Sequence, residues 1–242
     1  MHRCFNLIPG PSPMTRVSFG FLCAAIMFGD VALGAKVLAD DLSGAYLGGN
    51  FGRARNSYGT GFIDDQIASS AANLGDTVTY TAKSIKRMSD AWWVDTGYLV
   101  TPYVGIEAAF LHIGEFKYLA YGTLKGSASQ PLGTTTEVIS HGPALSVILR
   151  VPLSESFQAE LRLGDYFGKT TLDTNVTVAS RSAFTALTKT TSGVLASVGA
   201  AYNIGGHWSV RVDYLRVNDT GDKNTVGKFS VNLATAGISF TF

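Results

Sequence analysis

The chain has 242 residues, with 19 basic and 18 acidic side chains, so its formal net charge is only +1. This balance excludes an electrostatic argument for a nucleic-acid partner. The composition is 46% hydrophobic and includes 27 glycines. Beyond the N-terminal region, however, no stretch approaches the roughly 20 apolar residues of a spanning helix. The combination favours strands in which apolar and polar residues alternate.

The N-terminal region has the pattern of a secretory signal. An apolar stretch, residues 17–35, follows Arg16, and the small residues around Ala39 suit cleavage by a signal peptidase. We therefore predict a cleaved signal at residues 1–39 and a short periplasmic lead at residues 40–43. Met14 would make a more ordinary signal start, which suggests that the gene start is over-extended. Both cysteines, Cys4 and Cys23, lie in the predicted signal, so we expect no internal disulfide in the exported chain.

Eight segments with a period of two follow in chain order, and each predicts a strand. They lie at about residues 44–56, 87–100, 103–118, 144–151 (the end of the fourth strand), 157–168, 190–204, 207–217 and 231–242. Long polar connections are predicted at residues 57–86, 119–133 and 169–189, with a shorter one at 218–225. Asp64 begins a candidate short helix in the first of these, and alternation at residues 175–178 suggests that strands extend beyond a membrane. Very short turns are expected at residues 101–102, 152–156 and 205–206.

Alternation places several charged residues on the inner faces of the predicted strands. They comprise four acids and three arginines: Asp95, Glu107, Glu160, Asp213, Arg150, Arg162 and Arg211. An even number of strands, joined by alternately long and short connections, predicts an eight-stranded antiparallel up-and-down transmembrane β-barrel at residues 44–242 with its short turns at the periplasm. Aromatic residues beside those turns predict an interfacial girdle: Tyr98, Tyr103, Phe157, Tyr202, Trp208 and Phe242.

The last strand ends as GISFTF, and Gly237, Phe240 and Phe242 fit a known spacing. This ending resembles the C-terminal assembly signal of bacterial outer-membrane barrels. Two further segments, GVLASVGAAYNIGGHWSVRVDYLRV at residues 193–217 and YLGGNFGRA at 46–54, resemble the transmembrane domain of OmpA-like proteins, including opacity-type surface proteins. The resemblance covers about residues 44–242. It does not extend to the periplasmic peptidoglycan-binding domain that follows the barrel in full-length OmpA.

This resemblance implies an outer-membrane location and a structural role in the envelope, with loops for interaction or adhesion. The implied partners are outer-membrane lipids and lipopolysaccharide, the barrel assembly machinery through the C-terminal strand, and a host or surface ligand at the loops. Nucleic acid is not an expected partner, and the loose motifs support the fold better than any activity.

Three functional hypotheses follow from the inner face and the histidines. In the first, the seven charges pair across a lumen narrow enough to be filled by side chains, and the protein is not an enzyme. In the second, the same charges line a narrow porin-like channel or a carrier of small solutes, with Glu107 and Arg211 in a switchable ion-pair network. In the third, His112 or His141 serves a lipid-modifying enzyme, although alternation puts both on the lipid-facing side. No metal site, cofactor or phosphate-binding loop is predicted.

Overall fold

The computed structural model describes residues 44–242 except 74, 127–128, 180 and 223. The predicted signal and lead, residues 1–43, lie outside the described residues. Nine strands and one helix follow one another: β1 (Gly44–Asn56), α1 (Gly61–Ala72), β2 (Thr77–Lys86), β3 (Met88–Leu99), β4 (Val104–Lys125), β5 (Ser129–Pro152), β6 (Phe157–Val178), β7 (Arg181–Gly205), β8 (Trp208–Asp222) and β9 (Gly227–Thr241). No helix in this part of the chain is long and apolar enough to cross a membrane.

Eight of the strands close into a ring, which confirms the predicted barrel. The order β4-β3-β1-β9-β8-β7-β6-β5 is completed by pairing of β5 with β4, and every pairing in the ring is antiparallel. The first and last strands meet in a register that sets Leu47 opposite Phe240. The ninth strand, β2, lies outside the ring and pairs with the far half of β4. Arg87 separates it from β3, so the prediction of an unstructured connection at residues 57–86 was wrong for β2.

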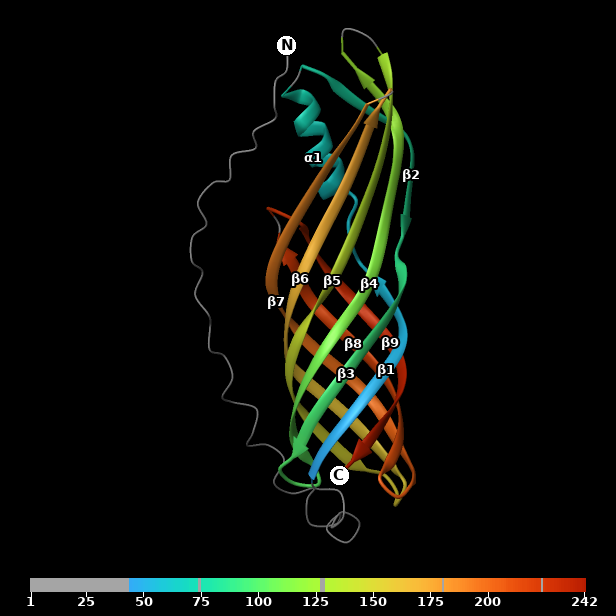
Figure 1. The fold of residues 1–242 in the computed structure, drawn as a ribbon, viewed down its shortest axis with the longest axis vertical. Coiled ribbons are helices and arrows are strands. Elements are labelled where there is room, and N and C mark those ends of the chain that lie inside the picture. Colours follow the sequence, from blue (N-terminus) through green and yellow to red (C-terminus); the bar gives the residue numbers. More distant parts are fainter. Residues whose placement is uncertain (1–43, 74, 127–128, 180, 223) are drawn as a thin grey trace. The chain divides into compact units, whose positions relative to one another are not determined.

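The two ends of the barrel differ in length and in content. The short turns and the C-terminus lie at one end, the turn end, while β4, β5, β6 and β7 rise well above their neighbours at the other, the extended end (Figure 1). The strands β6 and β7 are 22 and 25 residues long, about twice what a membrane-spanning strand requires.

The predicted connections at residues 119–133 and 169–189 are therefore mostly strand. Pairs of hydroxyl groups across β6 and β7 show why these polar residues form strands. Thr171 faces Thr188 and Thr177 faces Ser182, with hydroxyl oxygens 3.3 Å and 2.9 Å apart. Threonine is a good strand former, and cross-strand hydroxyl pairs stabilise a sheet whether or not one face is apolar. A polar, threonine-rich composition was mistaken for a loop.

A β-bulge in β4 changes which residues face the lumen. The register with β5 shifts between His112 and Gly114, and Gly114 has φ +92°. The extra residue moves the inward positions from odd numbers to even ones, so that Phe116 and Tyr118 continue the buried face. A side chain at Gly114 would also collide with the main chain of Asp90. The bulge therefore keeps the inner face of the upper sheet apolar.

The helix α1 packs over the extended end. It begins at Gly61, three residues before the predicted start at Asp64, and buries Ile63 and Ala71. The Asp64 carboxylate accepts hydrogen bonds from the Tyr118 hydroxyl and the Lys83 ammonium, both 2.6 Å long. Burial, followed by the Asp64 carboxylate, raises the pKa of Tyr118 above its ordinary value. The phenol therefore stays protonated and continues to donate, which holds the helix against β4.

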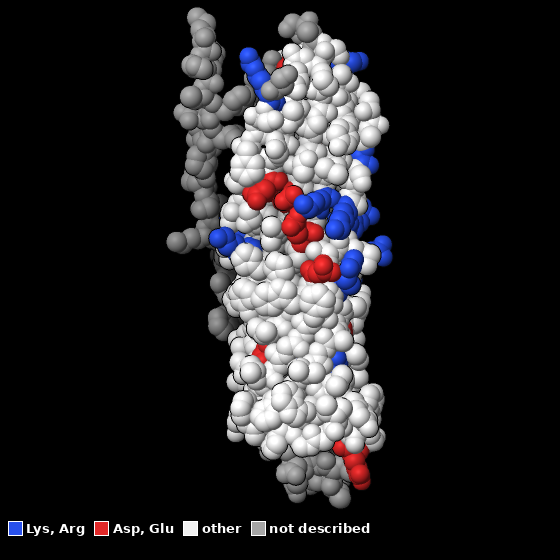
Figure 2. Space-filling model, turned by 45° about the vertical axis from the view of Figure 1, so that its right-hand side comes forward, with Lys and Arg blue, Asp and Glu red and all other residues white. Residues whose placement is uncertain are grey.

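A broad apolar band surrounds the barrel between its two ends. Outward positions carry half-exposed large residues such as Leu47, Ile106, Leu163 and Val212. Figure 2 shows charged side chains gathered above a lower zone that carries few of them. Five of the six predicted girdle aromatics are exposed near the turn end: Tyr98, Phe157, Tyr202, Trp208 and Phe242. The sixth, Tyr103, is only partly exposed.

Candidate functional site

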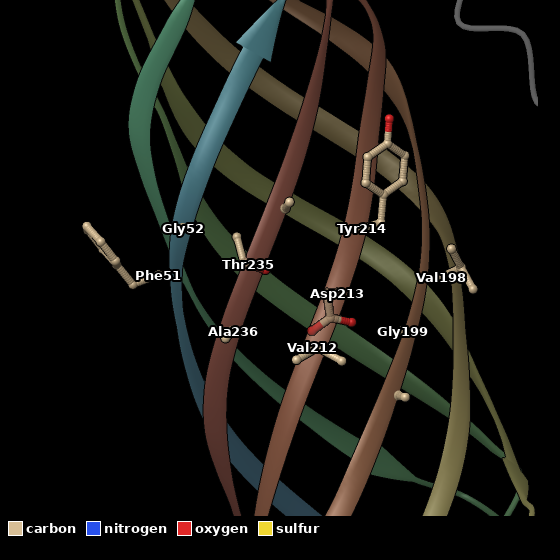
Figure 3. A pocket seen from close by; sticks show the side chains of 11 residues that line it. Phe51, Gly52, Val198, Gly199, Val212, Asp213, Tyr214, Thr235 and Ala236 are labelled. Carbon is tan, nitrogen blue, oxygen red and sulfur yellow. The ribbon is translucent and has the colours of Figure 1, made fainter.

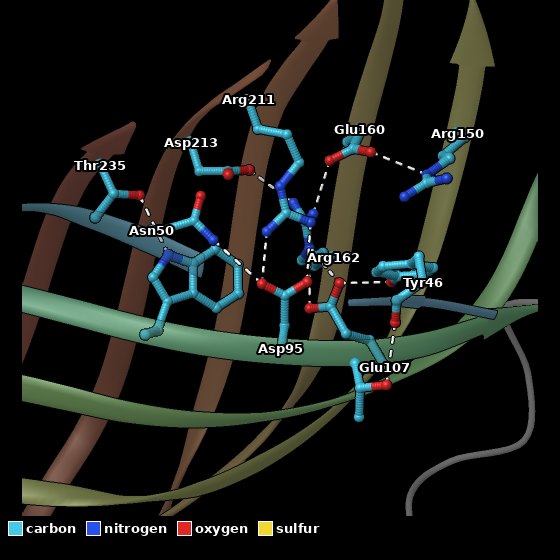
Figure 4. A network of polar contacts seen from close by, with 12 residues as sticks. Tyr46, Asn50, Asp95, Glu107, Arg150, Glu160, Arg162, Arg211, Asp213 and Thr235 are labelled. Atoms are coloured by element: carbon cyan, nitrogen blue, oxygen red, sulfur yellow. Dashed lines mark hydrogen bonds and ion pairs between the residues drawn. The ribbon is translucent and has the colours of Figure 1, made fainter. Parts of the chain in front are cut away.

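The most concentrated polar chemistry lies inside the barrel, in the half nearer the turn end. Five strands, β3, β4, β5, β6 and β8, each turn one or two charged residues inward, because side chains at alternate positions share a face. The structure brings all seven predicted residues into this layer: Asp95, Glu107, Arg150, Glu160, Arg162, Arg211 and Asp213. Each is at most 5% exposed. We call this set, drawn in Figure 4, the charge layer.

Arg162 is the hub of the charge layer. Its Nε lies 3.1 Å from both carboxylate oxygens of Glu107, its Nη2 donates to Glu160 (2.7 Å), and its Nη1 donates to Asp213 (2.7 Å). The guanidinium thus binds carboxylates from β4, from β8 and from its own strand. Charge-assisted bonds of this kind are stronger than neutral ones. One side chain therefore ties opposite walls of the barrel together.

A second pair lies beside the hub. Arg211 donates through Nη1 and Nη2 to the two carboxylate oxygens of Asp95, at 2.9 Å and 2.5 Å. This fork-to-fork geometry fixes both side chains. The Asn50 amide also donates to Asp95 (3.2 Å), and it brings β1 into the layer. The indole of Trp93 lies 5.3 Å and 5.6 Å from the guanidinium carbons of Arg162 and Arg211, a cation–π arrangement.

The layer continues toward the turn end through Glu160 and Glu107. The Arg150 Nε lies 2.9 Å from a Glu160 oxygen as an ion pair. The hydroxyl of Tyr46 donates to Glu107 (2.6 Å), and its ring lies 4.6 Å from the Arg150 guanidinium carbon. Tyr46, Asn50 and Trp93 were not among the residues predicted for this layer. Their shared alternation with the charged residues was the signal that could have found them.

Apolar side chains fill the lumen on both sides of the charge layer. Toward the turn end, Tyr46, Leu99 and Ile148 form a small buried cluster. Toward the extended end lies a much larger apolar cluster, which includes Leu111, Phe116, Leu195, Leu215 and Leu233. Ile63 of α1 and Tyr58 also belong to that cluster. Within the described residues, the lumen is therefore a packed core with one charged stratum, as expected for a barrel of eight strands.

The chemistry available to this arrangement is electrostatic cross-linking. The guanidiniums remain charged, and in a water-poor interior an ion pair is favourable only if its geometry satisfies both partners. Within the residues that the structure describes, no three His, Cys, Asp or Glu side chains come together as metal ligands would. Through its ion pairs, the charge layer cross-links opposite walls of the barrel.

The two histidines of the enzyme hypothesis lie on the outer wall, away from the charge layer. His112 stacks on Trp92, with ring centroids 5.6 Å apart, and lies 6.4 Å from His141 on the neighbouring strand. Trp92 is 40% exposed on the same outward row. Among the described residues, neither imidazole makes a side-chain hydrogen bond to a carboxylate that could orient it as a base. Their surroundings are those of aromatic surface residues.

The three residues of the predicted assembly signal occupy β9 and its end. The rings of Phe240 and Phe242 meet edge to face, with centroids 5.2 Å apart, and the Phe240 ring centroid also lies 5.0 Å from that of Trp208. Gly237 faces inward, where a β-carbon would collide with the main-chain oxygen of Gly49 on β1. The glycine thus has a packing role of its own, because it lets the first and last strands approach closely.

Comparisons with known proteins agree with this geometry. A family model described as "OmpA-like transmembrane domain" matches residues 43–242. No curated protein sequence matches the chain.

Several solved outer-membrane proteins are similar in fold. Neisserial surface protein A is 12% identical, with coverage of 83% of this chain and 98% of its own and a TM-score of 0.43. Ail, the attachment invasion locus protein of Yersinia pestis, is 10% identical over 82% and 99% of the two chains, with a TM-score of 0.40. The outer-membrane protease OmpT of Escherichia coli is 11% identical over 84% and 98%, with a TM-score of 0.43. At such low identity these likenesses concern the fold alone.

Proposed function

Because the chain belongs to the OmpA-like transmembrane domain family, we propose that it is a non-enzymatic outer-membrane barrel with a structural role in the envelope and a surface for interaction or adhesion. The observation that carries this proposal is the filled lumen, in which the charge layer lies between two apolar clusters. A packed interior of this kind suits a structural role. It leaves the outer surface of the barrel as the part that can contact partners. Outer-membrane lipids and lipopolysaccharide are the partners of its apolar band.

The part available to a surface ligand is the sheet that β4, β5, β6 and β7 form above the barrel (Figure 1). Its outer face carries threonine and serine hydroxyls beside charged groups. Lys117, for example, binds Glu115 (2.8 Å) and Glu137 (2.7 Å). A rigid, polar sheet loses little conformational entropy on binding compared with a flexible loop. The proposed interaction or adhesion surface is therefore a pre-organised sheet rather than a set of mobile loops.

The alternative function is a narrow channel or a carrier of small solutes, and the polar charge layer is the observation that favours it. The refolded chain should nevertheless give a flat current in planar lipid bilayers, because ions would have to pass the apolar cluster around Leu111, Leu215 and Leu233. Heat-modifiable electrophoretic mobility of the same sample would show that the barrel was folded. Discrete conductance steps that Glu107→Gln alters would establish the channel instead.

The C-terminal strand is proposed as the segment that the assembly machinery recognises, because β9 is the strand whose pairing with β1 closes the barrel. Phe242 is 71% exposed and its main contact is with the ring of Phe240, so Phe242→Ala should lower the stability of the refolded barrel by no more than about 1.5 kcal/mol. In cells the same change should leave most of the chain out of the outer membrane, as measured by membrane fractionation.

A matched control for this experiment is Tyr202→Ala. Tyr202 is an outward aromatic residue near the same end of the barrel, and it is 53% exposed. It should assemble normally, because it lies in β7 and not in the closing strand β9. Equal assembly of the two variants would show that the aromatic residues act only as interfacial anchors, and the recognition proposal would be wrong.

A further inference from the structure

A shallow apolar groove crosses the outer wall over β1, β7, β8 and β9, with a volume of about 620 Å³. Figure 3 shows small residues such as Ala236, Gly52 and Gly199 between the larger side chains of Phe51, Val198 and Tyr214. Asp213 also borders the groove, but its side chain is buried and binds Arg162. The groove surface is therefore almost wholly apolar, and an aliphatic chain is the kind of group that it can accommodate.

Arginines lie directly above this groove, toward the extended end. The register sets Arg216 of β8 opposite Asn232 of β9, and Asn232 opposite Arg55 of β1. Each cross-strand step is about 5 Å, so the two arginines lie about 10 Å apart on one outward row. Arg53 occupies the next row down, opposite Ala234 at the edge of the groove. We call Arg53, Arg55 and Arg216 the arginine row.

The arginine row has an excess of positive charge. Arg53 forms an exposed ion pair with Asp90 (3.1 Å). Arg55 and Arg216 are exposed, and among the described residues neither makes an ion pair. The Arg216 Nε donates a hydrogen bond to the Asn218 amide oxygen (2.7 Å). On the opposite wall, by contrast, Lys117 is held between two glutamates. Among the described residues, Arg55 and Arg216 thus place two positive charges without an ion-pair partner above the groove.

The height of the row fits the edge of a bilayer. Residues 232–242, which comprise most of β9 and the C-terminal residue, span about 25 Å at about 3.3 Å per residue and a tilt of about 40°. That is the height of the apolar band of such barrels. With the turn end at the periplasm, the arginine row lies at the surface of the outer leaflet and the groove lies in its hydrocarbon.

From these observations we infer that the groove and the arginine row together form a binding site for a phosphorylated lipid of the outer leaflet. An acyl chain lies in the groove against Ala234 and Ala236, and the phosphate lies between Arg55 and Arg216. Arginine suits this role because its planar fork binds phosphate oxygens in pairs. The inference deepens the proposed function, on which its membrane orientation rests, by naming the lipid class and the residues that hold it.

Lipid retention by the refolded chain, measured by native mass spectrometry from detergent micelles, tests the site. The probes are diphosphoryl lipid A, its dephosphorylated form, and phosphatidylglycerol. Both phosphorylated probes should be retained over the dephosphorylated one, and the stronger of the two identifies the natural source. The double variant Arg55→Gln/Arg216→Gln should weaken retention of the stronger probe about 25-fold, at about fivefold for each arginine. Equal retention of phosphorylated and dephosphorylated lipid A would overturn the inference.

Two matched controls separate the site from general effects of charge and size. Arg181→Gln/Lys125→Gln removes two positive charges from exposed positions beyond the membrane band and should retain lipid like the wild type. Ala236→Phe should fill the groove and weaken retention, whereas Ala108→Phe, an outward position on β4, should not. Heat-modifiable mobility of every variant shows whether it is folded, and fractionation of cells shows whether the protein is in the outer membrane. A failure of the proposed function can therefore be distinguished from a failure of the lipid site alone. Normal retention by the arginine variant or by Ala236→Phe would overturn the site.

Discussion

Replacing Arg162 with leucine should lower the free energy of unfolding of the barrel by about 3–5 kcal/mol. The reason is the number of charges left behind. Arg162 binds Glu107, Glu160 and Asp213, and all three carboxylates are buried. Removal of the guanidinium leaves them facing one another in an interior with little water, where an uncompensated charge is costly. Urea unfolding in lipid vesicles, followed by tryptophan fluorescence and by heat-modifiable mobility, measures the change.

A surface arginine provides the control for this prediction. Arg53 also forms an ion pair, with Asp90, but both side chains are more than half exposed. Arg53→Gln should therefore change stability by no more than about 1 kcal/mol. A variant that lacks Arg162 and two of its three partners, Arg162→Met with Glu107→Gln and Asp213→Asn, should recover part of the loss, because the remaining carboxylate of Glu160 still pairs with Arg150. If Arg162→Leu unfolds at the same urea concentration as the wild type, the charge layer does not stabilise the barrel.

Alternation in the sequence predicted which charged residues enter the lumen, but it could not predict how they pair. Glu107 and Arg162 are 55 residues apart in sequence and touch only because the barrel closes. Their contact depends on the stagger between strands, which the period of two does not contain. The hub role of Arg162 is thus a property of the closed ring. The sequence indicated a set of inward residues, and the register determined the partners.

The strands beyond the apolar band were predicted poorly for a related reason. A strand in a membrane is recognised by its apolar outer face, and that signal ends where the band ends. Above it, both faces of β6 and β7 carry threonine, serine and alanine, so alternation of hydropathy is weak even though β propensity remains high. The bulge at Gly114 had a clearer signal, because an isolated glycine within a strand pattern often marks one.

Gly52→Val should lower the free energy of unfolding of the barrel by about 3 kcal/mol, the upper end of the usual cost of overpacking. Gly52 faces inward in β1, opposite Thr235 of β9. A β-carbon there would collide with the main-chain oxygen of Ala234 and lie 2.7 Å from the Cα of Thr235. These are backbone atoms, so no rotamer change relieves the contact, and the two closing strands would have to separate. Urea unfolding in lipid vesicles measures the cost.

Gly49 in the same strand supplies the control, because nothing lies within 4 Å of the position that its β-carbon would take. It points outward, toward the apolar band, where a β-branched side chain suits both the strand and the lipid. Gly49→Val should therefore stay within about 0.5 kcal/mol of the wild type. Since the two substitutions add the same atoms to one strand, the difference between their free energies of unfolding measures the effect of the close approach of β1 and β9. Equal stability of both variants would mean that the barrel closes more loosely than the register of these strands indicates.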